Sequence, residues 1–266
     1  YSTGLFGKWH LGDDPQHHPG ARGFDEAITS MGQHFNFKTN PPVSYPEGTY
    51  LADFLTDKAI DFIQRHAKEP FFLCLHHFAV HSPHEAKQNL IQRFEGKPPA
   101  DGHNSPVYAA MIASVDESVG RVLATLQELG LDDKTLVIFT SDNGPWWEGD
   151  TNGLRGRKNL PLEGGFRVPM IARWTNTIPP GLVTDAPAMN FDLFSTSLAA
   201  AGLSTPVDRI IDGRNLLPLL TAQTDASPHE TLFFYKGRKL VGVRSGDWKY
   251  YRRHSSDNGA YPFFSQ

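Results

Sequence analysis

The chain has 266 residues, of which 39% are hydrophobic and 20% charged, so it can bury the core of one large domain or two smaller ones. This composition excludes a disordered chain, and the single cysteine excludes an internal disulfide. The formal charge of −4 provides no basic field for nucleic acid or anionic lipid. Apolar runs stay far below the roughly 18 residues of a membrane helix, so no membrane span is predicted.

The first half of the chain predicts two helices and a strand. Helical spacing of apolar residues runs from Thr49, a potential cap, to about Lys68. The apolar run Phe71 to Val80 predicts a buried strand. A second helix is expected after Ser105, which can cap it, and before Gly130, which can end it.

In the second half, Thr135 to Thr140 and Arg167 to Trp174 predict core strands, and Asn190 to Ala201 predicts a helix. Three short alternating runs between residues 231 and 252 then predict a small antiparallel unit. Strands that alternate with helices favour an α/β fold, with helices packed on a mostly parallel sheet.

Three polar clusters lie at the expected strand ends or in loops beside them. They are the segment Gly7 to Gly12, the segment His81 to His84, and the pair Asp142 and Asn143, which Lys158 follows downstream. Ligands of open α/β sheets bind outside the carboxyl ends of the strands. We therefore expect the three clusters to converge on one site.

The oxygen atoms of Asp142 and Asn143 suit a hard cation such as Ca²⁺ or Mg²⁺. Two ligands are too few for Ca²⁺, which takes about six to eight oxygens, and Asp-Asn-Gly after a strand is also a common turn. Lys8 and Lys158 have the charge to neutralise a phosphate or sulfate oxygen, although each taken alone is also typical of a solvated surface lysine.

Among the 12 histidines, His10 and His81 are the natural acid/base pair for ester cleavage, because each belongs to one of the polar clusters. His84 is an outside candidate. The neighbours His76 and His77 lie within the predicted strand and are expected to be structural. Trp146 and Trp147 form either a platform for a sugar ring or part of the packing.

Five segments of the chain, in order, resemble the sulfatases of the alkaline phosphatase superfamily, and within them the arylsulfatase and N-acetylgalactosamine-6-sulfatase branch. The segments are GKWHLG at 7–12, HPGARGFDE at 18–26, FFLCLHHFAVHSPH at 71–84, SDNG at 141–144 and LRGRKNLPLEGGFRVP at 154–169.

The resemblance implies an alkaline phosphatase-like, mostly parallel sheet between helices, with the start of a small C-terminal antiparallel unit. It implies a catalytic domain over residues 1–228, whose N-terminal part is missing, and a second subdomain from 229 to 266. It also implies a role for each site residue. Asp142 and Asn143 would bind Ca²⁺, Lys8 and Lys158 would hold sulfate oxygens, His10 would contact the hydroxyl of the nucleophile, His81 would protonate the leaving group, and His34 and Trp146 would contact substrate.

The implied activity is hydrolysis of a sulfuric ester in a sulfated carbohydrate, such as a glycosaminoglycan, or in an aryl sulfate. Sulfatases of this family use a formylglycine made from Cys or Ser in a C/S-x-P-x-R motif, which these 266 residues do not contain. We therefore expect the nucleophile to lie upstream of Tyr1 and the chain alone to be inactive. The family also implies export to the periplasm, the lysosome or the cell exterior.

Two other functions stay open. A phosphomonoester or phosphonate hydrolase of the same superfamily would share the sheet and the metal chemistry. A non-catalytic homologue would bind sulfated glycans without turning them over.

Overall fold

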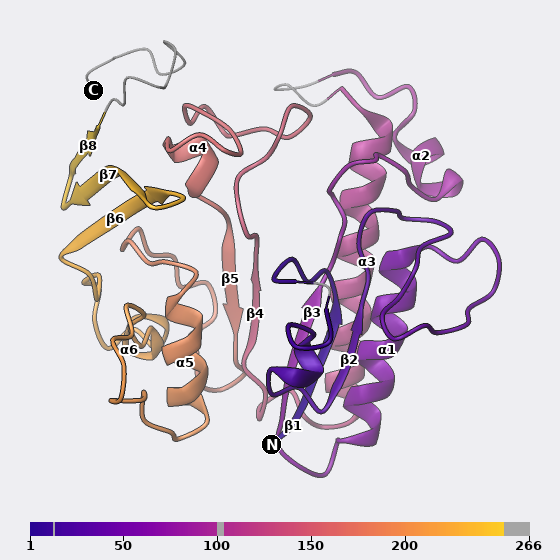
Figure 1. Ribbon diagram of the computed structural model, residues 1–266, viewed down its shortest axis with the longest axis horizontal. Helices are drawn as coiled ribbons and strands as arrows, with labels where there is room; N and C mark the ends of the chain where they lie inside the picture. Colours follow the sequence, from indigo (N-terminus) through magenta and orange to yellow (C-terminus); the bar gives the residue numbers. More distant parts are fainter. Residues whose placement is uncertain (13, 100–103, 253–266) are drawn as a thin grey trace. The chain divides into compact units, whose positions relative to one another are not determined.

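The computed structural model describes residues 1–12, 14–99 and 104–252 (Figure 1). The chain forms two compact units, Tyr1–Thr135 and Leu136–Gln266. Residues 253–266 of the predicted C-terminal subdomain lie outside the described residues. The predicted fold class is confirmed, since the first unit contains a parallel sheet with helices and the second contains antiparallel strands.

The sheet of the first unit has β1 (Ser2–Gly7) in its centre, between β2 (Glu26–Thr29) and β3 (Phe71–His76). All three strands are parallel, and Gly7 lies opposite both Thr29 and His76. The segments that follow β1 and β3 therefore leave the sheet at the same edge, as proposed for two of the polar clusters.

Three helices accompany this sheet: α1 (Leu51–Arg65), α2 (Gln88–Phe94) and α3 (Pro106–Glu128). Helix α1 contacts β1 and β3, and α3 contacts both α1 and α2. The apolar face of α1 supplies much of the core. The buried members of that core are Phe6, Phe37, Leu51, Phe54, Leu55, Ala59, Phe62 and Phe78.

The predicted N-cap of α3 is confirmed, because the Ser105 hydroxyl accepts a hydrogen bond from the Tyr108 N–H at 3.2 Å. The predicted cap of α1 is wrong. Thr49 instead donates its hydroxyl to the Pro46 carbonyl, and α1 begins at Leu51 without a side-chain cap. A short connecting segment, η1 (Pro19–Ala21), is capped by the ring of His18.

Strand β3 ends at His76 and does not reach the predicted Val80. Its partner β1 ends at Gly7, directly opposite His76, so the ladder between the two strands stops there. The chain then turns, and Phe78 is buried in the core.

The second unit begins with β4 (Val137–Thr140), which pairs antiparallel with β5 (Met170–Arg173). The predicted parallel arrangement does not extend to this pair, whose strands are shorter than the sequence suggested. Between them lies the short helix α4 (Glu163–Phe166), and α5 (Asp192–Ala200) follows.

A last short helix, α6 (Leu217–Leu220), precedes the C-terminal sheet. The sheet consists of β6 (Thr231–Lys236), β7 (Lys239–Ser245) and β8 (Trp248–Tyr251), all antiparallel as predicted. The domain boundary at residue 228 stays a prediction. No helix within the described ranges is long and apolar enough to cross a membrane.

The ring of His77 belongs to a buried polar network between α1 and α3. Its Nε2 lies 2.8 Å from the Ser118 hydroxyl, which lies 2.6 Å from the Thr56 hydroxyl. Thr56 donates its single proton to the Ala52 carbonyl, so Ser118 donates to Thr56 and accepts from His77. Burial lowers the pKa of His77 to about 4, which fits its predicted structural role.

We predict that acid destabilises the first unit through His77. Its folded-state pKa of about 4 lies below the ordinary 6.5, so the unfolded chain binds a proton first as the pH falls. The stabilisation is complete above pH 6.5 and is lost between pH 6.5 and 4, to a total of about 3 kcal/mol. Amide hydrogen exchange in α1 and α3 measures this loss. His77→Gln, which keeps a donor for Ser118 but does not titrate, should flatten the profile, and equal pH profiles would contradict the prediction.

Candidate active site

Lys8 and His10 follow β1 through a close backbone approach at Gly7. Gly7 has a φ of +124°, and a Cβ there would lie 1.9 Å from the carbonyl oxygen of His76. The same oxygen accepts the N–H of Lys8 at 2.7 Å. Only glycine fits this position, and the close approach sets the direction in which the half-buried Lys8 and the exposed His10 leave the sheet.

The segment that carries His10 is tied to the residues after it by side-chain hydrogen bonds. The indole N–H of Trp9 donates to the His17 carbonyl at 2.9 Å. Asp14 in turn accepts the backbone N–H of His17 at 3.1 Å and lies 2.6 Å from its ring Nδ1. The exposed His10 therefore follows a residue, Trp9, whose side chain is held in place.

His81 follows β3 and has a defined ring orientation. Its Nδ1 lies 2.8 Å from the Ser82 carbonyl, and its ring stacks on Phe78 with centroids 5.0 Å apart. A carbonyl only accepts hydrogen bonds, so Nδ1 carries a proton. The Nε2 atom of His81 is therefore the one available for proton transfer.

The ring of His34 is completely buried, with 0% exposure. Its Nε2 lies 2.8 Å from the carbonyl oxygen of His81, and its faces lie against Tyr50 and Phe78. Burial lowers its pKa, and the nearby carboxylate of Glu85 opposes this. A ring without exposed surface cannot touch a substrate in this conformation, which removes the structural basis of the predicted substrate contact.

His84, the outside candidate, is half-buried, and its ring packs edge-on against Tyr108 at 5.5 Å. Cys74, in the middle of β3, has a pKa raised to about 11 by burial. Such a thiol is not a nucleophile at neutral pH.

In the second unit, Asp142 and Asn143 directly follow β4 and are called the Asp-Asn pair below. Asp142 is exposed and Asn143 is half-buried. The Ser141 hydroxyl donates to the Asn143 carbonyl at 3.0 Å, and the Asn190 amide donates to the Ser141 carbonyl at 2.9 Å. The turn that carries the Asp-Asn pair is therefore held by Asn190, which lies just before α5.

Residues 154–162, which carry Lys158 and are named the lysine loop, lie beside the Asp-Asn pair through backbone hydrogen bonds. The N–H of Lys158 donates to the Pro145 carbonyl at 3.0 Å, and the N–H of Gly144 donates to the Gly165 carbonyl at 2.9 Å. The structure thus brings the Asp-Asn pair and Lys158 into adjacent segments of one unit, although 14 residues or more separate them in sequence.

Glycines make this packing of segments possible. A Cβ at Gly144 would lie 1.9 Å from the Gly164 carbonyl oxygen, and one at Gly164 would lie 2.2 Å from the Gly156 carbonyl oxygen. Both oxygens are backbone atoms that cannot rotate away. The turn of the Asp-Asn pair and the lysine loop therefore both pack against the Glu-Gly-Gly segment, Glu163 to Gly165.

Arg157 holds the loop of the two exposed tryptophans, a role that no local sequence pattern predicts. Its guanidinium donates to the carbonyls of Trp146 at 2.6 Å and Gly149 at 2.8 Å, and it lies over the ring of Trp147 at 5.7 Å. Trp146 is 47% and Trp147 68% exposed. The substrate contact of Trp146 stays a prediction.

Lys249 of β8 ties the C-terminal sheet to α4. Its ammonium pairs with the Glu163 carboxylate and lies 3.9 Å from the ring centroid of Phe234 and 4.9 Å from that of Tyr251. Burial lowers the pKa of Lys249, and the Glu163 carboxylate opposes this shift. Helix α4, which follows the lysine loop, is thereby anchored by Lys249 in addition to the backbone bond between Gly144 and Gly165.

Lys8, His10 and His81 belong to the first unit, and the Asp-Asn pair and Lys158 belong to the second. Their convergence on one site stays a prediction. In the part of the chain that the structure describes, no group of three or more His, Cys, Asp or Glu side chains is arranged to hold a metal ion.

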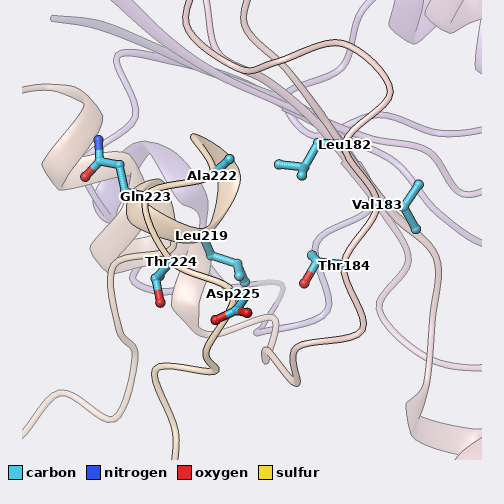
Figure 2. A pocket seen from close by; sticks show the side chains of 8 residues that line it. All are labelled: Leu182, Val183, Thr184, Leu219, Ala222, Gln223, Thr224 and Asp225. Carbon is cyan, nitrogen blue, oxygen red and sulfur yellow. The ribbon is translucent and has the colours of Figure 1, made fainter.

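The second unit also carries a hollow of about 390 Å³, which Figure 2 shows. None of the predicted site residues lines it, and Asp225 is its one charged lining residue, so it offers no cation for an anionic ester. The lining residues are Leu182, Val183, Thr184, Leu219, Ala222, Gln223, Thr224 and Asp225.

A family model described as Sulfatase matches residues 1–203. The chain belongs to the sulfatase family. A second model, N-sulphoglucosamine sulphohydrolase, C-terminal, matches residues 157–254 of this sulfatase chain.

The mouse N-acetylgalactosamine-6-sulfatase is 37% identical over 94% of the chain and 52% of its own length. The human steryl-sulfatase is 39% identical over 76% of the chain and 34% of its own length. The solved structure of Ps i-CgsB in complex with k-i-k-neocarrahexaose has a TM-score of 0.83 at 29% identity, over 94% of the chain and 62% of its own. The chain spans about half the length of the N-acetylgalactosamine-6-sulfatases that it matches.

We predict that Gly144→Ala disrupts the packing beside the Asp-Asn pair. The added methyl group would meet a backbone oxygen, and such overpacking costs about 1–3 kcal/mol. Hydrogen exchange in β4 and β5 measures the loss. The control is Gly120→Ala, on α3, where a Cβ meets nothing within 4 Å and alanine favours the helix by up to about 1 kcal/mol. Equal stability of Gly144→Ala and wild type would contradict the prediction.

Proposed function

We propose that the protein containing this chain hydrolyses sulfuric esters and releases sulfate from a sulfated carbohydrate or an aryl sulfate. The main support is the placement of Lys158 beside the Asp-Asn pair, in a chain of the sulfatase family. The names of the similar proteins, an N-acetylgalactosamine-6-sulfatase and a protein solved with neocarrahexaose, favour a sulfated carbohydrate.

We propose Ca²⁺ as the metal ion, because the Asp-Asn pair offers a carboxylate and an amide oxygen after β4. These hard donors fit Ca²⁺ but supply only two of its six to eight oxygens. A bound cation would add positive charge near the sulfate oxygens. The donor set is incomplete among the described residues.

The charged side chains of the chain have separable tasks in this proposal. Lys8 and Lys158 neutralise the sulfate oxygens, whose charge grows in the transition state. The imidazolium of His81 donates its Nε2 proton to the leaving oxygen, because its Nδ1 is committed to the Ser82 carbonyl. His10, exposed beside Lys8, accepts a proton from the hydroxyl of the nucleophile.

A formylglycine would supply the nucleophile as an aldehyde hydrate. The proposal for this group rests on the family alone, since the 266 residues contain no C/S-x-P-x-R motif. We further propose export of the protein, and a catalytic segment up to residue 228 followed by a C-terminal subdomain.

The phosphonate hydrolase alternative has a structural neighbour, the phosphonate monoester hydrolase SpPMH from Silicibacter pomeroyi, with a TM-score of 0.61 at 21% identity. This likeness shows the fold alone. Turnover of phenyl sulfate against a phosphonate monoester, such as phenyl methylphosphonate, by the full-length protein distinguishes the two activities. A glycan-binding homologue without catalysis would turn over neither.

We predict that Lys158→Ala in the full-length protein lowers kcat/KM for phenyl sulfate at least about a hundredfold, as loss of one transition-state charge contact does. Steady-state kinetics measures it. Lys239→Ala serves as the control, because Lys239 is an exposed lysine at the start of β7 in the same unit. Near-normal activity of Lys158→Ala would contradict the site.

We also predict that the effect of His81→Ala depends on the leaving group. Phenolate is a strong base and needs a proton, so turnover of phenyl sulfate should fall about a hundredfold. Nitrophenolate leaves without one, so turnover of 4-nitrophenyl sulfate should fall far less. Equal losses for the two esters would remove His81 from the role of proton donor.

A further inference from the structure

The strongest unexplained group in the first unit is the imidazole of His34. It is fully buried, and it forms a hydrogen bond with the main chain of His81, 47 residues further along. Burying an imidazole without full hydrogen-bond compensation costs free energy, and the Nδ1 of His34 has no partner among the described residues. A leucine or phenylalanine would fill the same space without that cost.

His34 is connected to His81 by a direct hydrogen bond and by a shared aromatic neighbour, Phe78. Its Nε2 donates to the His81 carbonyl at 2.8 Å, which fixes the main chain at the predicted proton donor. Its ring also lies 4.9 Å from the ring of Phe78, and the ring of Phe78 in turn stacks on that of His81 at 5.0 Å. The ring plane of Phe78 is inclined by 32° to that of His34 and by 28° to that of His81, so Phe78 contacts both imidazoles.

The protonation state of His34 follows from the same contacts. The His81 carbonyl only accepts, so the proton of a neutral His34 lies on Nε2. The charged groups that face His34 are Glu85, His81 and His84, and the Glu85 carboxylate accepts the backbone N–H of His34 at 3.4 Å. Burial outweighs the carboxylate and keeps the ring neutral.

We infer that His34 is a positioning residue for His81: its Nε2–H holds the His81 carbonyl, and its ring packs against Phe78, on whose ring the His81 imidazole stacks. This inference rests on the proposed role of His81 as the proton donor. It replaces the predicted contact of His34 with substrate. With its carbonyl held, and its own Nδ1 bound to the Ser82 carbonyl, the His81 ring keeps Nε2 in one direction.

Three variants of the full-length protein separate the two contacts. His34→Gln places an amide N–H near the position of Nε2 and so keeps the bond to the His81 carbonyl. His34→Asn places its amide near the position of Nδ1, one bond short of that carbonyl. His34→Phe keeps an aromatic ring beside Phe78 but has no donor. Thermal unfolding of each variant establishes that it folds, and the Gln and Asn pair carries the test if the Phe variant does not.

The readout is the ratio of kcat for phenyl sulfate to kcat for 4-nitrophenyl sulfate. A misplaced proton donor slows the first ester and spares the second, whereas a general structural defect slows both equally. We expect His34→Asn and His34→Phe to lower this ratio at least about tenfold, because displacement of a catalytic group by about 1 Å costs up to about a hundredfold. His34→Gln should stay within about threefold of wild type.

Unchanged ratios in His34→Asn and His34→Phe would overturn the positioning role, and so would a ratio in His34→Gln as low as in His34→Asn. His81→Ala, measured in parallel, separates failure of the positioning role of His34 from failure of the proton-donor role of His81. If His81→Ala lowers the ratio and the His34 variants do not, the positioning inference alone fails. If His81→Ala leaves the ratio unchanged, both the role of His81 and the inference fail.

Discussion

The carbonyl oxygen of His76 occupies the space in which residue 7 would otherwise carry a side chain. This contact between two backbones joins the ends of β1 and β3, and the N–H of Lys8 completes it by binding the same oxygen. The second unit uses the same device, since the carbonyl oxygen of Gly164 fills the space beside Gly144. Charged side chains in both units are therefore carried by backbone packing, which does not depend on rotamers and leaves little freedom to the segments that hold them.

The sequence predicted the elements whose signals are local. Helix α3 has its cap and its terminating glycine within a few residues of its ends, and the C-terminal sheet has alternating strands with a turn between the last two. Strands β1 and β2 were missed because their short sequences, with Ser, Gly and Glu, favour no strand and become strands only by pairing in the sheet. The length of β3 was overestimated for a related reason, because its end is decided by where its partner stops and not by its own apolar run.

The candidate site shows the same division. The Asp-Asn pair could be located because a predicted strand and the polar residues after it are neighbours in sequence. Lys8 was found without its strand, from the glycines and the histidine beside it in the segment 7–12. The groups that hold them could not be located. His34 reaches His81 across 47 residues, and Lys249 reaches Glu163 across 86. In sequence, His34 was one polar residue among many and its burial was invisible, so it was assigned to substrate.

The anchoring of α4 by Lys249 bears on how this chain can be shortened for laboratory use. The Glu163 carboxylate is 29% exposed and meets two cations, both from the C-terminal sheet: Lys249 of β8 and Arg244 of β7, the latter at 4.0 Å. A version that stops after the β6–β7 hairpin would keep Arg244 but lose Lys249, and with it the ammonium that lies on the ring of Phe234. The Glu163 carboxylate would then keep only the more distant Arg244, and the rings of Phe166 and Phe234 would lose the cation that packs on them. The small terminal strand therefore belongs in any fragment that is meant to keep α4 anchored.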